Sequence, residues 1–458
     1  MENQGRCYQG GIHHGTGEKL QRFFCGESVK TVVVLLLIEL MLYFLVEDRE
    51  EYTDYQAITS AIMLLTIVSC VLAFWAGVDR YLLVIILLLL NIGFVVQELE
   101  SGSIISCDYF LIKFCVVIAV AFLTALLYWR LADFLASDRA VIAIMVVQAG
   151  LCAALLVLGI QTGNIREQGA VLTLRVGAVT FTPFELVKVL YLFVAAGLLC
   201  KKEKTVRIGW RVLHRETLLI VHTLILFVFA FLCRELGTVL VIYFTGLAML
   251  WIFGENRMRT AVLAGVTGLG FTGFWVLSDR ILYPMSVSGE LALSGVITKL
   301  IARFGTALHP EQAVFGAGYQ GTMALEAVAM GGVLGIREYW YRLPIPEASS
   351  DMMFANINQT CGVFIGSIVV VCFFALWKRG MDIASDCESR YLQGLATAIS
   401  LVLAIESVIH IGYNLGLFPI TGIPLYFVSQ GFTAMATSLV LAAILLVLST
   451  GQRLGGQW

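Results

Sequence analysis

Long runs of apolar residues dominate the chain, and each run is about as long as a helix that crosses a lipid bilayer. About 20 apolar residues cover the hydrocarbon core of a membrane, and hydrophobic residues make up 59% of this 458-residue sequence. Charged residues make up 14%, against about 25% in soluble domains. The pattern predicts an all-α polytopic membrane protein with about twelve transmembrane helices. We place them at residues 31–47, 57–76, 81–98, 108–128, 139–160, 183–200, 217–233, 236–253, 261–278, 361–377, 392–412 and 427–449.

Lysine and arginine gather in alternate connectors between these spans, and this bias indicates the orientation of the chain. Short cytoplasmic loops carry an excess of Lys and Arg. The connector 200–216, CKKEKTVRIGWRVLHRE, is rich in both, whereas 48–56 and 99–107 are poor in them. We therefore predict cytoplasmic tails at 1–30 and 451–458, with both termini inside the cell.

The longest connector, roughly residues 279–360, then falls on the outer side and has a pattern of its own. Residues 290–308 alternate apolar and polar positions, and 312–335 is rich in Gly, Ala and Met. We expect one or two helices here, lying on or dipping into the outer face. A structured loop of this length usually has a function. The chain shows no 20–50-residue repeat and no clearly related halves.

Within this connector, the stretch 346–362, PEASSDMMFANINQTCG, carries one carboxylate next to an apolar run. Asp351 is expected where a loop enters a helix at a membrane face. Partial removal from water there can raise a carboxyl pKa and make the group a usable base. The alternative is that Asp351 favours the start of a helix as a cap or is a solvated loop charge.

Ionisable residues inside the predicted spans are costly and mark candidate functional sites. Glu185 and Lys188 follow Pro183 at i, i+3 spacing, so they can pair on one helix face. They are either part of a site or a structural pair that fixes helix packing. Glu406 and His410 stand at i, i+4 and either line a polar cavity or bond each other.

Arg234 and Glu235 lie in a very short connector at the outer face, CREL. Together with the charges in the spans, they indicate a hydrophilic cavity that opens outward, with Asp351 at its mouth. The eleven cysteines are scattered singly without a CxxC pair, which favours buried apolar packing and predicts no protein-built metal site. The net charge of −2 and the lack of a basic tract give no sign of nucleic-acid binding.

Five segments between about 177 and 450 resemble, in order, motifs of the SEDS family, the RodA/FtsW/SpoVE group of bacterial shape, elongation and division proteins. FTPFELVK resembles QPSELxK, and RELGT resembles QPDxGT. GAGYQ with MGGVLG resembles GYQ with GSGGLxG. The stretch around Asp351 resembles PEAHTDFIFAxxxEELG, and LFPITGIPLYFVSQG resembles LLPxTGxPLPFxSYGG. Matching residues include Pro183, Glu185, Lys188, Gly237, Thr238, Gln320, Gly335, Pro346, Asp351, Gly362, Thr421, Gly422 and Ser429.

The chain also departs from these motifs. Gln359 and Thr360 stand for the family's acidic pair, and Glu235 stands for an Asp. His410 stands for an Asn, and Ser349 for the His that precedes the acid. The family's GxxRW segment is not recognisable. Five spans precede the first motif where the family has three, so two are extra. We divide the chain into N-terminal spans (31–176) and a SEDS-like core (177–450).

The resemblance implies a peptidoglycan glycosyltransferase that polymerises lipid II at the outer face of the bacterial cytoplasmic (inner) membrane, in elongation, division or sporulation. It implies Asp351 as the base that takes a proton from the acceptor hydroxyl. Lys188, Arg234 and a divalent cation, Mg or Mn, are candidates to stabilise the leaving pyrophosphate. A class B penicillin-binding protein is the expected transpeptidase partner. The expected substrate-binding residues are Glu185, Lys188, Arg234, Glu235, Gln320, His410 and Ser429.

Two other classes of function remain open at this stage. A lipid-linked precursor flippase or transporter fits many spans with intramembrane charges, and it would favour broken helices and internal repeats. A non-catalytic scaffold for a penicillin-binding protein would keep the fold without the chemistry. The lost acidic pair favours the scaffold, whereas Asp351 and the Glu185–Lys188 pair favour the enzyme.

Overall fold

The structure is a computed structural model, and it describes residues 40, 78–101, 119, 123–124, 126–128, 130–161, 174–176, 179–208, 211–233, 235–282, 318–336 and 341–450. The chain divides into two compact units, residues 1–84 and residues 85–458. The account below concerns the second unit, which holds all the described elements apart from the first residues of one helix.

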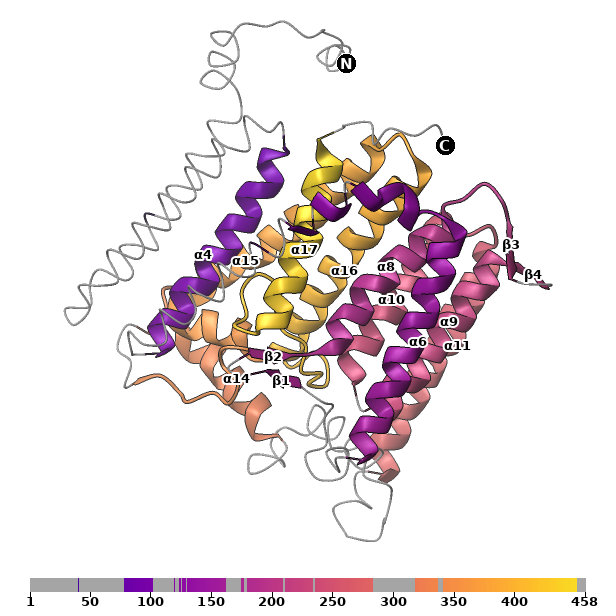
Figure 1. Cartoon of the computed structure of the whole chain (residues 1–458). Coiled ribbons are helices and arrows are strands. Elements are labelled where there is room, and N and C mark those ends of the chain that lie inside the picture. The colour runs from indigo at the N-terminus through magenta and orange to yellow at the C-terminus, as the bar shows by residue number, and fades with distance from the viewer. Residues whose placement is uncertain are drawn as a thin grey trace, which may run out of the picture. The chain divides into compact units, whose positions relative to one another are not determined.

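Long helices make up most of the described part of the chain (Figure 1). Within the described residues, seven helices are long and apolar enough to cross a membrane, so the chain is a multi-pass membrane protein, as predicted. The helices are α4 (Arg80–Ser101), α6 (Asp138–Gln161), α8 (Pro183–Leu199), α9 (Arg215–Leu232), α10 (Leu236–Phe253), α11 (Arg257–Leu277), α14 (Tyr319–Gly331), α15 (Met353–Asp386), α16 (Arg390–Asn414) and α17 (Phe432–Ser449).

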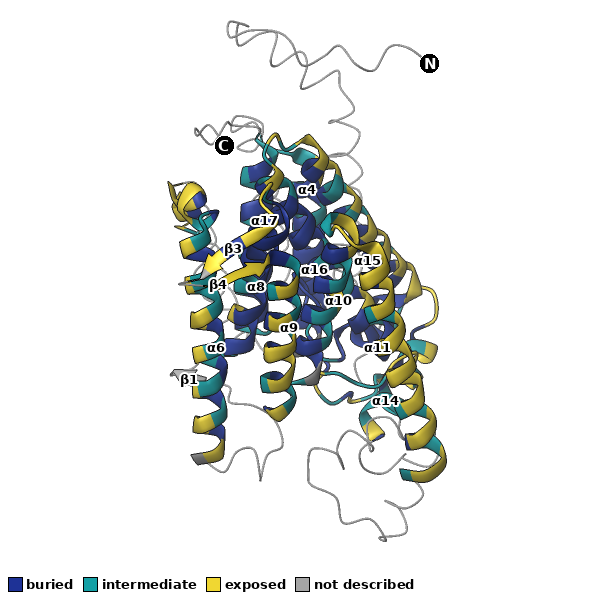
Figure 2. Cartoon of the chain, turned by 90° about the vertical axis from the view of Figure 1, so that its right-hand side faces the viewer, coloured by how far each residue is buried: buried dark blue, intermediate teal, exposed yellow. Residues whose placement is uncertain are grey.

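Helix α16 lies at the centre of the bundle, with α8, α10, α15 and α17 packed around it. Its side chains are mostly buried, whereas α6, α9 and α11 expose apolar faces on the outside (Figure 2). Leu224 on α9 and Leu269 on α11 are among these exposed side chains. The interior is mostly apolar with some buried polar side chains, and the apolar exterior suits a helical bundle surrounded by lipid.

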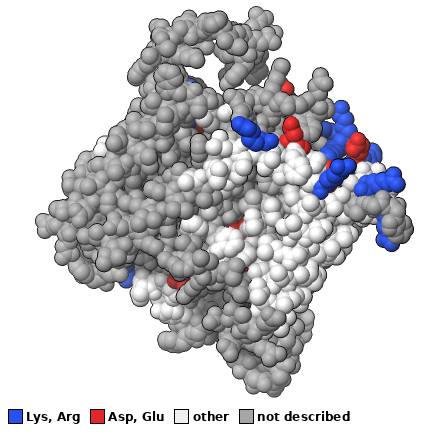
Figure 3. Space-filling model, viewed as in Figure 1, with Lys and Arg blue, Asp and Glu red and all other residues white. Residues whose placement is uncertain are grey.

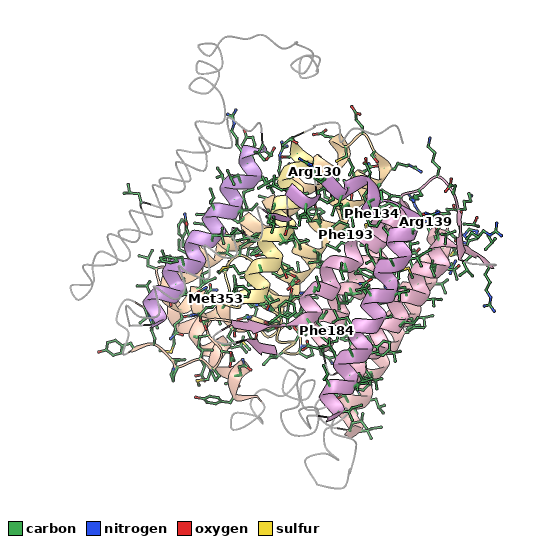
Figure 4. All side chains as sticks on the ribbon, in the orientation of Figure 1. Arg130, Phe134, Arg139, Phe184, Phe193 and Met353 are labelled. Carbon is green, nitrogen blue, oxygen red and sulfur yellow. The ribbon has the colours of Figure 1, made fainter. Side chains whose placement is uncertain are left out.

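The two ends of the bundle differ in charge. At one end Asp138, at the start of α6, accepts hydrogen bonds from Lys201 at 2.6 Å and from Arg215 at 2.8 and 3.0 Å. Figure 3 shows Lys and Arg gathered near this end, above a wide uncharged band. In Figure 4, Arg130 and Arg139 lie toward this end, whereas Phe184 and Met353 lie toward the other. The start of α15, and with it the Asp351 segment, is therefore at the end opposite the basic connector.

Two short antiparallel hairpins add strands that the all-α prediction did not contain. Strands β1 (Leu174–Val176) and β2 (Val179–Phe181) precede α8. Strands β3 (Thr205–Ile208) and β4 (Arg211–His214) lie within the basic connector before α9. Alternating β-branched and polar residues in TVRI and RVLH suit strands, but hydropathy over 20-residue windows does not detect segments this short.

Helix α15 is broken at Gly362, which adopts φ 84° and ψ 168°. The break leaves amides after Gly362 without partners in their own helix. Val363 N donates to the carbonyl of Gly332 at 2.9 Å, and Ile336 N donates to the carbonyl of Gln359 at 2.8 Å. A turn after α14 thus completes the backbone hydrogen bonds of the broken helix, as a buried break requires.

The structure corrects the predicted boundaries of two spans. The predicted span 361–377 belongs to the longer helix Met353–Asp386, and the predicted span 427–449 begins only at Phe432, because residues 415–431 form a loop. Helix α14 confirms a helix within 312–335. Apart from Leu40, the predicted spans 31–47 and 57–76 and the segment 290–308 lie outside the described residues.

We expect Gly362→Ala to lower the apparent melting temperature of the protein in detergent, by an amount equivalent to about 2–5 kcal/mol of unfolding free energy. A Cβ atom at residue 362 would overlap the Val333 carbonyl, and a positive φ strains any side chain. The matched control is Gly270→Ala on α11, where the space is open. Equal melting temperatures for the two variants would contradict the role given to the break.

Candidate functional site: the Asp351 loop

Asp351 lies in a tight turn, two residues before the start of α15. We call residues 341–352 the Asp351 loop. Its turn is built on Glu347, a non-glycine residue with φ 56°. The Glu347 carbonyl accepts hydrogen bonds from the amides of Ser350 at 3.1 Å and Met352 at 2.9 Å. Strained non-glycine residues of this kind gather at functional sites, since the surrounding contacts must hold them in place.

A second loop, residues 415–431, packs against the Asp351 loop and is joined to it by hydrogen bonds. Ser429 Oγ donates to the Ser350 carbonyl at 2.9 Å, and the Gln430 amide donates to the Ser349 carbonyl at 2.9 Å. Ser429 Oγ also accepts from the Leu425 amide at 2.9 Å. The 415–431 loop contains a strained residue of its own, Phe427, with φ 65°.

The end of α16 holds the backbone of Asp351. Tyr413 Oη lies 2.8 Å from the Asp351 carbonyl oxygen, and Asn414 Nδ2 donates to the same oxygen at 3.2 Å. In the first turn of α15, the Phe354 amide donates to His410 Nε2 at 3.4 Å, and the Ala355 amide donates to Asn414 Oδ1 at 3.1 Å. Side chains of α16 therefore satisfy orphan amides at the start of α15.

This geometry corrects the alternative interpretation of Asp351 as a helix cap. Met352 occupies the position before the first helical residue, and the first-turn amides bond to α16. The Asp351 carboxylate instead lies beside Gly422, where a Cβ atom would stand 3.3 Å from Asp351 Oδ2. Gly422 is exposed and has φ 71°, so a side chain there would be strained and would crowd the carboxylate. The half-buried acid thus stands next to an exposed stretch of bare backbone.

Amide side chains support the Asp351 loop from the opposite side. Gln320 Nε2, on α14, donates to the Pro346 carbonyl at 3.3 Å, and Gln359 Nε2, on α15, donates to the Leu343 carbonyl at 3.3 Å. Because a carboxylate has no proton to donate, the geometry explains why an amide suits position 359 here where the family motif has an acid.

A buried ion cluster lies between α8, α16 and the 415–431 loop. Lys188 Nζ is 2.7 Å from Glu185 Oε1 and 2.9 Å from both carboxylate oxygens of Glu406. Tyr426 Oη donates to Glu185 Oε2 at 2.9 Å, and its ring faces the ammonium. Lys188 is 2% exposed and Glu406 is fully buried. The predicted Glu185–Lys188 pair is confirmed, and Glu406 extends it.

The predicted site residues differ in how far they are buried and in which groups they contact. Glu185, Lys188, His410 and Ser429 are enclosed and bonded to protein groups in this conformation, and their contact with substrate stays a prediction. Glu406 binds Lys188 and not His410. Gln320 is half-buried at the Asp351 loop, and Glu235 is half-buried just before α10. Arg234 lies outside the described residues.

A divalent cation stays a prediction. Among the described residues, no group of three His, Cys, Asp or Glu side chains has the arrangement of a metal site. Mg²⁺ is commonly bound by one or two carboxylates together with substrate phosphates, and Asp351 is the half-buried carboxylate at the site. The described residues thus do not by themselves make a complete cation site there.

Three residues that organise the site were missed in the sequence: Tyr413, Asn414 and Tyr426. The first two could have been found by spacing, because Glu406, His410, Tyr413 and Asn414 fall at i, i+4, i+7 and i+8 and form one polar face on an apolar helix. Tyr426 stands where the related motif has a proline, and no periodicity marks it.

Seen as a class, this is a polytopic helical membrane protein whose buried charges support an acidic loop at the end of the bundle opposite its basic connector. The family profile described as "Cell cycle protein", FTSW_RODA_SPOVE, matches residues 79–454. The chain belongs to this family. The match begins after the first two predicted spans, 31–47 and 57–76, so these two predicted segments lie outside the part of the chain that matches the family.

Individual relatives agree with the family assignment. The chain is 29% identical to the stage V sporulation protein E of Bacillus subtilis over 82% of this chain and 98% of that protein. It is 34% identical to a probable peptidoglycan glycosyltransferase FtsW of Trichlorobacter lovleyi over 36% of this chain and 46% of that protein.

Solved structures share the fold. A chain from a peptidoglycan synthase complex, described as coordinating polymerization and crosslinking, matches with a TM-score of 0.57 at 21% identity, over 82% of this chain and 99% of that chain. The rod shape determining protein RodA of Thermus thermophilus matches with a TM-score of 0.51 at 18% identity, over 82% and 98%.

We expect Lys188→Met to destabilise the protein by about 3–5 kcal/mol, because two buried carboxylates would lose their shared cation. The apparent melting temperature in detergent measures the effect. The matched control is the triple variant Glu185→Gln, Lys188→Met, Glu406→Gln, which removes all three charges and should recover most of the loss. If the Lys188→Met protein has the same apparent melting temperature as the wild type, the ion cluster does not hold α8 to α16.

We also expect Gln359→Glu to lower stability, even though the family motif has an acid in this region. The carboxylate would face the Leu343 carbonyl, so a hydrogen bond would be replaced by two opposed acceptors, at a cost of about 1–3 kcal/mol. Gln359→Met, similar in volume but uncharged, serves as the control and should lose less. A Gln359→Glu protein that melts above Gln359→Met would contradict this account of the loop.

Proposed function

We propose that this protein is a peptidoglycan glycosyltransferase that polymerises lipid II, with Asp351 as the general base. The observation that carries the proposal is the position of the Asp351 side chain. Asp351 has its backbone fixed by Tyr413 and Asn414, and its carboxylate stands beside the exposed backbone of Gly422. Relatives that carry the name probable peptidoglycan glycosyltransferase support the reaction class.

In the proposed reaction, the acceptor hydroxyl approaches the carboxylate across Gly422. Asp351 takes the hydroxyl proton as the oxygen forms a bond to the anomeric carbon of the donor. The bond from that carbon to the pyrophosphate oxygen breaks, and the lipid pyrophosphate leaves with the bonding electrons. A base placed within hydrogen-bond reach contributes typically 10²–10⁴-fold, on the order of 3–5 kcal/mol.

The leaving group needs positive charge close by. Lys188 is held between two carboxylates, so it reaches substrate only if the ion cluster opens. Arg234 and a divalent cation therefore remain the proposed partners of the pyrophosphate. The start of α15, close to Asp351 in sequence, contributes the positive end of a helix dipole to the same region.

We propose further that the Asp351 loop faces outward from the bacterial cytoplasmic membrane and that both termini are cytoplasmic. The basic connector with Lys201 and Arg215 at the opposite end supports this orientation under the positive-inside rule. The expected partner is a class B penicillin-binding protein. A structural neighbour that comes from a complex coordinating polymerization and crosslinking supports such a pairing.

The broken helix does not favour a transporter over a polymerase. Transporters place their breaks near the bilayer midplane. In α15 the residues from Val363 to Asp386 come after the break, and these roughly 24 residues extend about 36 Å, enough to span the bilayer alone. The break therefore serves the Asp351 loop at one end of the bundle. A scaffold without chemistry would not need a carboxylate placed beside an exposed glycine.

We expect Asp351→Asn to abolish glycan strand formation, by at least about 10²-fold, while the protein keeps its melting temperature. The assay uses purified full-length protein with labelled lipid II, with and without the penicillin-binding partner and with and without Mg²⁺ or Mn²⁺. The strands are resolved on a gel.

The matched control is Glu326→Gln, an exposed carboxylate on α14 near the same loop, which should leave strand formation unchanged. Wild-type strands only in the presence of the partner would indicate an enzyme that its partner activates. A folded Asp351→Asn protein with wild-type activity would remove the acid from the mechanism.

A further inference from the structure

His410 is fully buried at the end of α16, and both of its ring nitrogens contact backbone groups. Nδ1 lies 2.6 Å from the carbonyl oxygen of Ile423, and Nε2 lies 3.4 Å from the amide nitrogen of Phe354. A carbonyl only accepts and an amide N–H only donates. The two partners therefore require a neutral ring with its proton on Nδ1 and a lone pair on Nε2.

These two partners come from the two segments that meet at the Asp351 carboxylate. Phe354 is in the first turn of α15, three residues after Asp351. Ile423 directly follows Gly422, the residue against which Asp351 Oδ2 lies. The His410 imidazole thus connects the start of α15, which follows Asp351, to the 415–431 loop, which lies against the Asp351 carboxylate. A change in this joint alters the position of the carboxylate without touching it.

We propose that His410 is a positioning residue, which sets Asp351 against Gly422 and does so only as the neutral imidazole. The inference rests on the proposed function for its kinetic consequence, but its structural consequence is independent of activity. If His410 gains a proton, Nε2–H faces the Phe354 N–H, and a positive charge stands at the positive end of the α15 dipole. The contact is lost, the first turn of α15 loosens, and Asp351 moves from its place.

The groups around His410 that titrate or carry charge are few in the described part of the chain. Tyr413 Oη on the same helix lies 3.0 Å from Nδ1, 2.8 Å from the Asp351 carbonyl oxygen and 2.6 Å from the Ile423 carbonyl oxygen, and its one proton is donated to one of these carbonyls at a time. Glu406, one turn earlier, binds Lys188 of α8. From the side of α15, Asp351 is the nearby acid. Because Asp351 must itself be ionised to act as a base, its own titration is present in every His410 variant, and only the additional histidine titration is removed by substitution.

The first experiment is hydrogen–deuterium exchange of the full-length protein in detergent, measured between about pH 3 and pH 8, because a fully buried imidazole resists protonation. The rates are corrected for the intrinsic pH dependence of exchange. The readout is the protection of amides at the start of α15, which include Phe354 and Ala355. The variants are His410→Asn, which keeps a donor and an acceptor but cannot titrate, and His222→Gln on α9. His222 is the second buried histidine of the described chain, and it bonds Gln148 away from the Asp351 loop.

We expect wild-type protection to fall on acidification by about tenfold or more relative to His410→Asn. The His222→Gln protein should behave as the wild type does. Equal pH dependence in wild type and His410→Asn overturns the proposal, whatever the activity of the protein.

The second experiment measures initial rates of strand formation over the same pH range. We expect His410→Asn to lower the rate at neutral pH by about twofold to fivefold and to move the acid-side midpoint of the profile to lower pH. A residue with only a structural role would reduce the rate without moving that midpoint, which would overturn the positioning role. If no strands form in the wild type at any pH, the proposed function fails, and the exchange experiment still decides the role of His410.

Discussion

The polar face of α16 is the constraint on which the rest of the site depends. Glu406, His410, Tyr413 and Asn414 lie along one side of a helix that is otherwise apolar and central in the bundle. A polar side chain inside a membrane protein needs a hydrogen-bond or ionic partner. Each of these four side chains contacts a partner outside α16. The helix therefore holds α8 through Glu406, and it holds the two loops around Asp351 through His410, Tyr413 and Asn414, which lie one to two turns further along.

The ion cluster and the loop contacts are linked through this helix. Glu406 binds Lys188 and so sets the register of α16 against α8. His410 and Asn414 lie one and two turns further along α16. Because a helix is stiff along its axis, the register of α16 also fixes where these two side chains contact the start of α15. In this account the buried charges do not touch substrate. They hold the frame in which one half-buried acid is placed, and Asp351 is the proposed catalytic base.

Hydropathy was enough to predict the class of fold, because a membrane span needs a long apolar run and such a run is visible in the sequence. The i, i+3 spacing was enough to predict the Glu185–Lys188 pair. The family motif marked Asp351, whose role as a base stays a prediction. The partners were not predictable in the same way. Glu406 and Lys188 are separated by more than 200 residues, and local spacing had suggested a Glu406–His410 pair instead. Long-range pairing depends on how the helices pack, and the periodicity of a single helix does not predict which other helix it contacts.

The loops illustrate a second reason for the limits of prediction. The break at Gly362 depends on carbonyls from a turn after α14, and the bare backbone at Gly422 matters because an acid from another loop lies against it. A glycine in a sequence shows where backbone freedom is available, but not which atom approaches it. The same holds for Gln359, whose amide replaces an acid because a carbonyl happens to face it.

A structure of the full-length Asp351→Asn protein with lipid II bound tests the central claim most directly. The quantity to measure is the distance from the side chain of residue 351 to the attacking hydroxyl of the acceptor. The account predicts that the acceptor lies over Gly422 with this distance at about 2.6–3.2 Å, the range for a general base. An acceptor hydroxyl bound away from residue 351, with another side chain in its reach, would contradict it.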